Sequence, residues 1–138
     1  PYAAAVIGIA QAALNLAIDW ARQRHTFGSA LADKQAIQWM LADSEIEIRA
    51  SRLLIWQAAW KGDLGLDIKV DASIAKVYAT ETAGRVVDRC IQVFGGLGVA
   101  KEMPLERWYR ELRIKRIGEG PSEVQRMVVA RNLLGNRG

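Results

Sequence analysis

The chain has 138 residues, of which 51% are hydrophobic and 25% charged, a balance that excludes a disordered protein and suits one compact domain. Its net charge of +4 comes from basic residues scattered among acids, so it is only weak support for binding to nucleic acid or membranes. A single cysteine, Cys90, and a single histidine, His25, exclude an intramolecular disulfide and a Cys/His metal cluster.

Segments rich in Ala, Leu, Glu, Arg and Gln alternate with glycines and prolines, and each such segment favours a helix. The first predicts a helix over residues 2–22, and residues 25–32, which include Gly28, predict a loop. Apolar residues recur along this helix at three- and four-residue steps, which places them on one face. They are Val6, Ile9, Ala13, Leu16 and Trp20.

Two longer helices are expected next. One runs over residues 34–60 with Asp33 as its N-cap, and another begins at the N-cap Asp71. Glycines at 95, 96 and 98 end the second of these, because glycine readily takes left-handed backbone angles. The residues expected to be buried are Ile37, Leu41, Ile48, Ile55 and Ala59 on the first, and Ile74, Val77, Val87, Ile91 and Phe94 on the second.

The rest of the chain predicts a short helix over residues 104–112 and a last helix from Pro121 to about residue 134. No strand-like alternation extends beyond four residues, so the predicted fold is an all-α, antiparallel up-and-down helical bundle similar to a four-helix bundle. Five tryptophans are many for this length, and we expect some in the core and some at a subunit interface. They are Trp20, Trp39, Trp56, Trp60 and Trp108.

Three further expectations concern the setting of the chain. Cys90 is expected in the core. The sequence predicts no signal peptide and no apolar stretch of membrane-spanning length, hence a soluble protein in a reducing compartment. Because the chain begins with Pro1 inside a predicted helix, we expect a fragment with more protein upstream.

Three predicted loops combine residue types that bind ligands. The first reads RQRHTFG from Arg22 to Gly28, with Gln35 shortly after it. The second reads QVFGGLG over residues 92–98, and the third reads RIGEGPSEVQR over residues 116–126. Taken singly, each loop is a weak indication of function.

Each loop has a functional and a structural interpretation. Arg24, Thr26 and Phe27 offer a cation, a hydroxyl and an aromatic face, which can hold a phosphate and stack on a flat ring. They can equally be a solvated loop and a core phenylalanine. Gly95 and Gly96 let a ligand approach the backbone, or they simply end a helix.

Glu119 lies between two glycines, immediately before a predicted helix start. The positive end of the helix dipole favours a carboxylate there, and such a carboxylate is usually structural. A catalytic base that faces an apolar cavity would instead need a raised pKa. The sequence leaves both alternatives open.

In this order and at these spacings, the three loops resemble the C-terminal helical domain of the acyl-CoA dehydrogenase family over essentially the whole chain. The resemblance implies a larger subunit with a helical N-terminal domain and a middle β-domain. FAD would lie between that β-domain and the bundle, and a second subunit would complete its site.

The resemblance also implies partners and a location. The expected partners are an acyl-CoA substrate, an electron-transfer flavoprotein, and further copies of the subunit in a homodimer or homotetramer, with no nucleic acid and no membrane insertion. Such an enzyme is cytoplasmic in bacteria and lies in the mitochondrial matrix or peroxisome in eukaryotes.

Individual residues take their roles from the same resemblance. Glu119 matches the catalytic glutamate, which removes the α-proton of the thioester while the β-hydrogen leaves as hydride to the flavin, giving a trans-2-enoyl-CoA. Its N–H and a flavin hydroxyl polarise the thioester carbonyl. Gly118 and Glu119 match substrate-binding positions. The residues matched to FAD contacts are Arg24, Thr26, Phe27, Gln35, Gln92, Val93, Phe94, Gly95, Gly96, Gly120, Pro121 and Ser122.

Two residues depart from the family pattern. Pro121 replaces a threonine, which removes a hydroxyl contact to the cofactor and stiffens the helix start. Gly118 replaces a tyrosine, which predicts a wider pocket for branched or bulky acyl groups.

Two alternative functions stay open. An acyl-CoA oxidase would share Glu119 but pass its electrons to oxygen. A non-catalytic helical oligomerisation module would explain the tryptophans but not the loops. We expect the domain alone to be inactive, because most of the flavin site lies outside it.

Overall fold

The computed structural model of the protein describes residues 1–135 and contains five α-helices joined by short connections. The all-α prediction is confirmed. The elements are α1 (Tyr2–Gln23), β1 (His25–Thr26), β2 (Ser29–Ala30), the 3-10 turn η1 (Leu31–Asp33), α2 (Gln35–Asp63), α3 (Lys69–Phe94), the 3-10 turn η2 (Gly95–Val99), α4 (Leu105–Lys115) and α5 (Ser122–Leu134).

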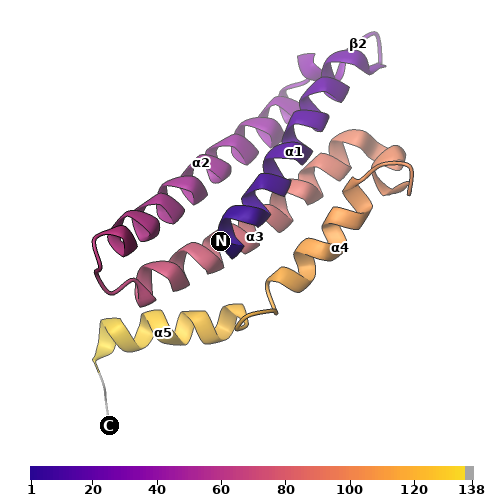
Figure 1. Cartoon of the computed structure of the whole chain (residues 1–138). Coiled ribbons are helices and arrows are strands. Elements are labelled where there is room, and N and C mark those ends of the chain that lie inside the picture. The colour runs from indigo at the N-terminus through magenta and orange to yellow at the C-terminus, as the bar shows by residue number, and fades with distance from the viewer. Residues whose placement is uncertain (136–138) are drawn as a thin grey trace.

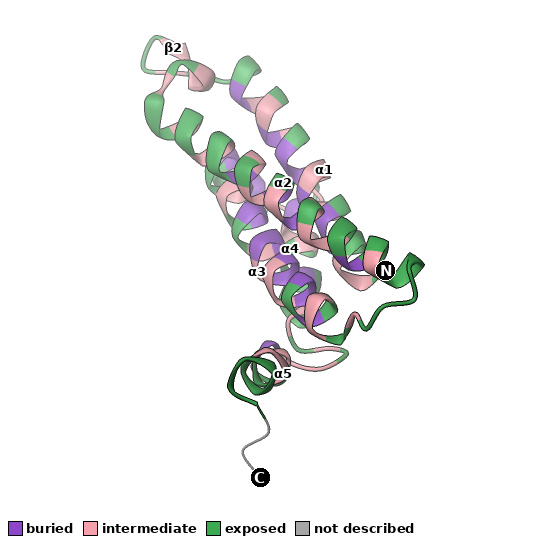
Figure 2. Ribbon diagram, turned by 90° about the vertical axis from the view of Figure 1, so that its left-hand side faces the viewer, coloured by how far each residue is buried: buried purple, intermediate pink, exposed green. Residues whose placement is uncertain are grey.

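Helices α1 to α4 run up and down as an antiparallel bundle, and α5 crosses the end where α2 and α3 are joined (Figure 1). In the view turned by 90°, α5 is seen end-on below the others (Figure 2). The central helix is α3, because it packs against α1, α2, α4 and α5. The predicted bundle is therefore found in the first four helices, and α5 closes its lower end.

The core is built on α1 and α3. On α1 the predicted face is confirmed in part: Val6 and Ala13 are fully buried, whereas Ile9, Leu16 and Trp20 pack against the core while half-buried. The other buried residues of this helix are Ile7, Ala10, Leu14, Ala17 and Ala21. By length and composition alone this helix could also cross a membrane, since an 18-residue window within it has a mean hydropathy of 1.5, so the prediction that no such stretch exists is wrong. Its composition is explained by its place in the bundle core.

The buried face of α3 differs from the prediction. Ile74 is exposed, and Val77 and Ile91 are only half-buried, whereas Val87 and Phe94 are buried as expected. The fully enclosed stripe consists mainly of small residues, because neighbouring helices approach α3 closely on several sides. It follows a different set of three- and four-residue steps, through Lys76, Ala79, Ala83, Val86, Cys90 and Val93.

Cys90 lies in this core as predicted. Burial raises the pKa of its thiol to about 12, against a smaller lowering by the nearby Arg89 charge. The cysteine is therefore a packing residue, since the thiolate is the reactive form.

Helix starts differ from their predicted caps. The Asp33 carboxylate accepts a hydrogen bond from the Ala30 N–H at 3.2 Å, so it stabilises η1, and α2 begins two residues later. Asp71 lies inside the first turn of α3 and pairs with Lys61 at 2.8 Å. Pro121 is itself the cap of α5, not its first residue.

The predicted loop over residues 25–32 contains a small hairpin. His25 pairs with Ala30 and Thr26 with Ser29, which leaves Phe27 and Gly28 as a two-residue turn. Both turn residues have positive φ, of 50° and 80°. This is the backbone of a type I′ turn, the connection whose twist matches that of two-residue hairpins.

The outer face of α2 leaves large apolar side chains in solvent, and green runs along much of this helix in Figure 2. Ala59, which was expected to be buried, is exposed on the same helix. Most of these side chains recur every seven residues, a spacing that keeps them on one side of the helix. We call this set the α2 outer stripe: Trp39, Ile46, Leu53, Trp56 and Trp60, each more than 60% exposed.

Candidate functional site

The three loops lie at two ends of the bundle. The first two share one end, where Trp20 of α1 stacks on Phe94 of α3 with ring centroids 5.0 Å apart. The third lies near the start of α1, since a Cβ placed on Gly118 would stand 3.0 Å from the Tyr2 hydroxyl. Helix α1 rises about 27 Å between Tyr2 and Trp20. The structure therefore brings the first two loops together and keeps the third apart.

The first loop presents an unpartnered aromatic ring. Phe27 is 101% exposed, and its φ of 50° costs a non-glycine residue about 1–2 kcal/mol. The Lys34 ammonium lies 5.9 Å from its ring centre. Arg24 is exposed, Thr26 is half-buried, and Gln35 is exposed at the start of α2. The segment from Arg24 to Gln35 thus displays an aromatic face, a cation and an amide around the hairpin.

The second loop combines buried side chains with an open backbone. Val93 and Phe94 are 4% and 7% exposed, so their side chains belong to the core, whereas Gln92 is exposed. A Cβ on Gly95 or Gly96 would meet nothing within 4 Å. A cofactor contact from Val93 or Phe94 would therefore use main-chain atoms, and the two glycines leave that part of the backbone accessible.

The third loop holds Glu119 in an unusual conformation. Its φ is 53°, in the left-handed region, and its side chain is exposed. Within residues 1–135, no hydrogen bond or ion pair engages its carboxylate or its main-chain N–H. Both groups are therefore free to face a ligand, while the main-chain oxygen accepts a long hydrogen bond from Gln125 at 3.4 Å.

A buried lysine holds this loop from beneath. Lys76 of α3 is 8% exposed, and its ammonium donates hydrogen bonds to the carbonyl oxygen of Gly118, at 2.9 Å, and to that of Gly120. Burial lowers the pKa of Lys76, and the carboxylates of Glu119 and Glu123 partly oppose that effect. The two anchored carbonyls flank the residue that the resemblance assigns as the base.

Tyr2 occupies the space beside Gly118. Burial raises the pKa of its hydroxyl, and the nearby charge of Glu119 raises it further. The Lys76 and Lys115 ammonium groups lie 5.8 Å and 5.0 Å from its ring centre. The room that the sequence predicted at Gly118 is thus partly filled by a ring from α1.

The residues after Glu119 connect the loop to α5. Gly120 has a φ of 89°, and a Cβ there would stand 2.5 Å from the amide nitrogen of Gln125. Pro121 caps the helix. Ser122 is 2% exposed, and its N–H donates to the Arg116 carbonyl at 3.1 Å. The Ser122 side chain is therefore enclosed within the chain.

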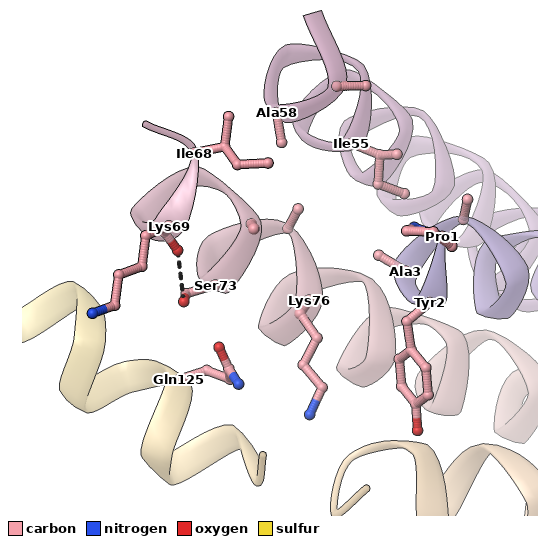
Figure 3. Close-up of a pocket in the computed structure, with 14 residues that line it drawn as sticks. Pro1, Tyr2, Ala3, Ile55, Ala58, Ile68, Lys69, Ser73, Lys76 and Gln125 are labelled. Carbon is pink, nitrogen blue, oxygen red and sulfur yellow. Dashed lines mark hydrogen bonds between the residues drawn. The ribbon is translucent and has the colours of Figure 1, made fainter. Parts of the chain in front are cut away.

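An apolar hollow of about 490 Å³ lies beside this loop, between the start of α1, the end of α2 and the start of α3. Figure 3 shows Lys76 and Tyr2 extending side by side toward the same edge of the hollow, with Gln125 approaching from α5. Most other walls are alanine and isoleucine side chains, so the hollow favours apolar groups.

The residues of the first two loops fit a flavin dinucleotide. The exposed Phe27 ring suits stacking on a flat ring system, the exposed Arg24 suits a phosphate, and the open backbone at Gly95 and Gly96 suits close approach. Three of the predicted contacts fit less well, because the side chains of Val93, Phe94 and Ser122 are buried.

Sequence reasoning missed Lys76 and Tyr2. A signal for Lys76 was present, because it continues the spacing of the small core residues at 79, 83, 86, 90 and 93. Nothing in the sequence indicated that Tyr2 would meet Gly118, since the two residues lie at opposite ends of the chain.

Comparison with protein families gives one match over nearly the whole chain. A family described as "Acyl-CoA dehydrogenase, C-terminal domain" matches residues 2–134. The chain is 46% identical to the 3-(aryl)acrylate reductase of Clostridium sporogenes, covering 96% of this chain and 35% of that protein. It is also 46% identical to the mitochondrial short-chain specific acyl-CoA dehydrogenase of Bos taurus, covering 96% and 32%. The chain thus spans about a third of the length of these relatives.

Solved structures share the same fold. Butyryl-CoA dehydrogenase from Megasphaera elsdenii is 43% identical with a TM-score of 0.94, covering 96% of this chain and 35% of that one. A chain in a structure of the electron transferring flavoprotein of Acidaminococcus fermentans is 36% identical with a TM-score of 0.95, covering 98% and 36%. The FAD complex of PigA is 29% identical with a TM-score of 0.93, covering 99% and 35%.

Proposed function

This chain belongs to the acyl-CoA dehydrogenase family as its C-terminal domain, and on that premise we propose that the whole protein oxidises an acyl-CoA thioester to a trans-2-enoyl-CoA. We propose that residues 1–138 form one domain of a subunit that also has a helical N-terminal domain and a middle β-domain. The domain alone then lacks most of the flavin site and is inactive.

Glu119 is the proposed base. This role is supported by the exposure of two groups on Glu119. Its carboxylate and its main-chain N–H have no partner among residues 1–135, and its φ lies in the left-handed region. A base must reach the proton it removes, and a donor must point at the oxygen on which charge develops. Both groups on one residue suit removal of a proton next to a thioester carbonyl.

The remaining residues bind and orient. Arg24, Phe27 and Gln35 on the first loop, with Gln92 and the backbone at Gly95 and Gly96 on the second, would hold the dinucleotide part of FAD, and Gly120 and Pro121 would lie against it near the base. FAD, when bound, supplies the hydride acceptor. We give Thr26 a smaller role because it is half-buried, and Val93, Phe94 and Ser122 a main-chain role only.

The separation of the loops supports a site shared between subunits. The first two loops and Glu119 lie at opposite ends of α1, which rises about 27 Å between Tyr2 and Trp20, so one chain presents them at two separate places. The α2 outer stripe supplies an apolar face of the kind that oligomers bury. We therefore propose a homodimer or homotetramer in which one subunit's hairpin completes its partner's flavin site.

Gly118 and Tyr2 together define the proposed acyl pocket near the base. Gly118 removes a side chain from the loop, while Tyr2 contributes a ring from α1 at 3.0 Å from where that side chain would begin. The preference for branched or bulky acyl groups thus depends on how far the Tyr2 ring leaves the space open.

The proposed electron acceptor is an electron-transfer flavoprotein, and the similarity to a chain in a structure of such a protein supports it. An acyl-CoA oxidase is the alternative enzyme. Exposing the reduced protein to air distinguishes them, because only the oxidase would reoxidise rapidly. The compartment we propose is the cytoplasm in a bacterium and the mitochondrial matrix or peroxisome in a eukaryote.

The test uses the full-length protein. We expect bound flavin that is bleached by at least one member of a panel of butyryl-, isovaleryl- and 3-phenylpropionyl-CoA. Glu119→Gln should keep its flavin but lose turnover by about 100-fold or more. Glu123→Gln, an exposed acid four residues further along, is the matched control and should stay active. Absence of flavin and of bleaching would overturn the function, whereas an active Glu119→Gln would overturn only the base.

A further inference from the structure

We propose that Lys76 is a positioning residue for Glu119: its ammonium group gathers the carbonyl oxygens of Gly118 and Gly120 and thereby fixes the backbone that carries the base. This inference rests on the proposed function of Glu119. Lys76 contacts neither the carboxylate nor any group that would react, so it acts through the loop.

The loop needs such an anchor because of its own composition. Glu119 lies between two glycines, which are the residues with the most backbone freedom. It also adopts a positive φ, a conformation that persists only when its surroundings hold it. Main-chain hydrogen bonds hold the two ends of the loop, from the Gly118 N–H to Ile114 and from the Ser122 N–H to Arg116. Among side chains, Gln125 contributes only long hydrogen bonds of 3.4 Å and 3.5 Å to the loop carbonyls, so Lys76 is the main side-chain restraint.

The anchored peptide also sets a direction. The carbonyl of Gly118 and the N–H of Glu119 belong to one planar trans peptide, in which the two groups point in opposite directions. Because the carbonyl points at the Lys76 ammonium, the N–H points away from it. Lys76 thus fixes the direction of the Glu119 N–H together with the position of the Glu119 carboxylate. If this peptide rotated, the Gly118 carbonyl would point toward the ligand in place of the N–H.

Burial disfavours the charged form of Lys76 and lowers its pKa, and the charged groups around it partly oppose that effect. The ring of Tyr2 and the carboxylates of Glu119 and Glu123 face the ammonium group, and no carboxylate among residues 1–135 pairs with it within 4.0 Å. Its cation is therefore compensated by carbonyl dipoles and more distant charges. Both hydrogen bonds of the Lys76 ammonium go to the carbonyl oxygens on either side of Glu119, and this placement suits a role in holding Glu119.

The experiment compares three variants of the full-length, flavin-loaded protein. Lys76→Met keeps the length of the stem but removes the donors, and Lys115→Met is the matched control, because Lys115 lies over the same Tyr2 ring without bonding the loop. Glu119→Gln tests the premise. Each is measured for kcat and KM, for exchange of the α-protons of the best panel thioester in D₂O, and for amide hydrogen exchange over residues 116–122.

We expect Lys76→Met to lower kcat and α-proton exchange per bound flavin by about 100-fold, as misplacement of a catalytic group does, with KM unchanged. Amide exchange over residues 116–122 should rise. Lys115→Met should behave like the parent. In a Glu119→Gln background, Lys76→Met should cause no further loss of turnover, because the two changes disable the same step.

Several outcomes would overturn the inference. Parent-like kcat in Lys76→Met, or an equal and additive loss in the Glu119→Gln background, would assign Lys76 to stability alone. If Lys76→Met does not bind flavin, Lys76→Arg serves instead, and its larger head group should lower kcat by about tenfold per bound flavin. Parent-like kcat there would also overturn it. An active Glu119→Gln would instead overturn the proposed base.

Discussion

Substitution of Gly118 by tyrosine tests whether Tyr2 fills the space that the loop leaves open. The new Cβ would begin 3.0 Å from the Tyr2 hydroxyl, closer than an ordinary van der Waals contact, so the Tyr2 side chain would have to shift. Overpacking of this kind costs about 1–3 kcal/mol. We therefore expect Gly118→Tyr to lower the thermal midpoint of the flavin-loaded protein, and Tyr2→Ala in the same molecule to restore part of it.

The assay is a double-mutant cycle with two readouts. The first is Tm, for which the pair should differ from the sum of the single changes by the equivalent of about 0.5–3 kcal/mol. The second is the ratio of kcat/KM for isovaleryl-CoA and butyryl-CoA, which should fall in Gly118→Tyr because the added ring narrows the pocket beside the base. Tyr109→Ala, on the exposed side of α4, provides a control that should be additive with Gly118→Tyr.

Two results would refute this reasoning. Additive effects of Gly118→Tyr and Tyr2→Ala on Tm would mean that the two rings do not compete for one space. An unchanged preference between branched and straight thioesters would mean that Gly118 does not shape the acyl pocket, even if the two rings do compete.

Two further predictions concern charge and assembly. Stability should fall as the pH drops below about 4.5, the ordinary glutamate value, because Arg126 lowers the pKa of Glu81, and Arg89 with Arg85 lowers that of Glu47 against the opposing effect of burial. A carboxylate whose pKa is lower in the folded state stabilises the protein above its unfolded-state pKa, and this stabilisation is lost when the group is protonated. The Tm of Glu81→Gln should therefore depend less on pH than that of the parent protein. A parent Tm that does not change in acid would contradict the prediction. Ile46→Glu with Leu53→Glu should shift sedimentation toward smaller species and release flavin, whereas Ile114→Glu, equally exposed on α4, should do neither. Unchanged sedimentation would exclude the α2 outer stripe as the interface.

The helices could be predicted from the sequence because helix-favouring residues, and the glycines and prolines that end helices, determine local structure. Long runs of helix-favouring residues lie between glycines and prolines, and these bound the helices to within a few residues. The caps were less predictable, because an aspartate near a helix start has other partners. Asp71 reaches Lys61 of the preceding helix, and no local pattern announces that choice.

The buried face of α3 was mispredicted because large apolar side chains were expected to mark it. A helix surrounded by others instead places its smallest residues at the closest contacts, and Ile74 is left near the edge of the bundle. Lys76 continues the small-residue stripe, yet a search for apolar periodicity passes over a lysine. Its partners, Gly118 and Gly120, lie more than 40 residues further on, so only the tertiary fold gives the lysine a role.

The two glycines beside Glu119 illustrate why a short motif indicates a base without establishing one. Gly118 makes room for the Tyr2 hydroxyl, and Gly120 takes a positive φ that strains other residues, so both suit the shape of the loop. The same two residues would leave an isolated loop free to move, and a mobile carboxylate is a poor base because the proton must be met in one geometry. A third element has to remove that freedom, and we propose that the buried Lys76 of α3 does so here. An anchor of this kind therefore strengthens the case that a glutamate between two glycines acts as a base.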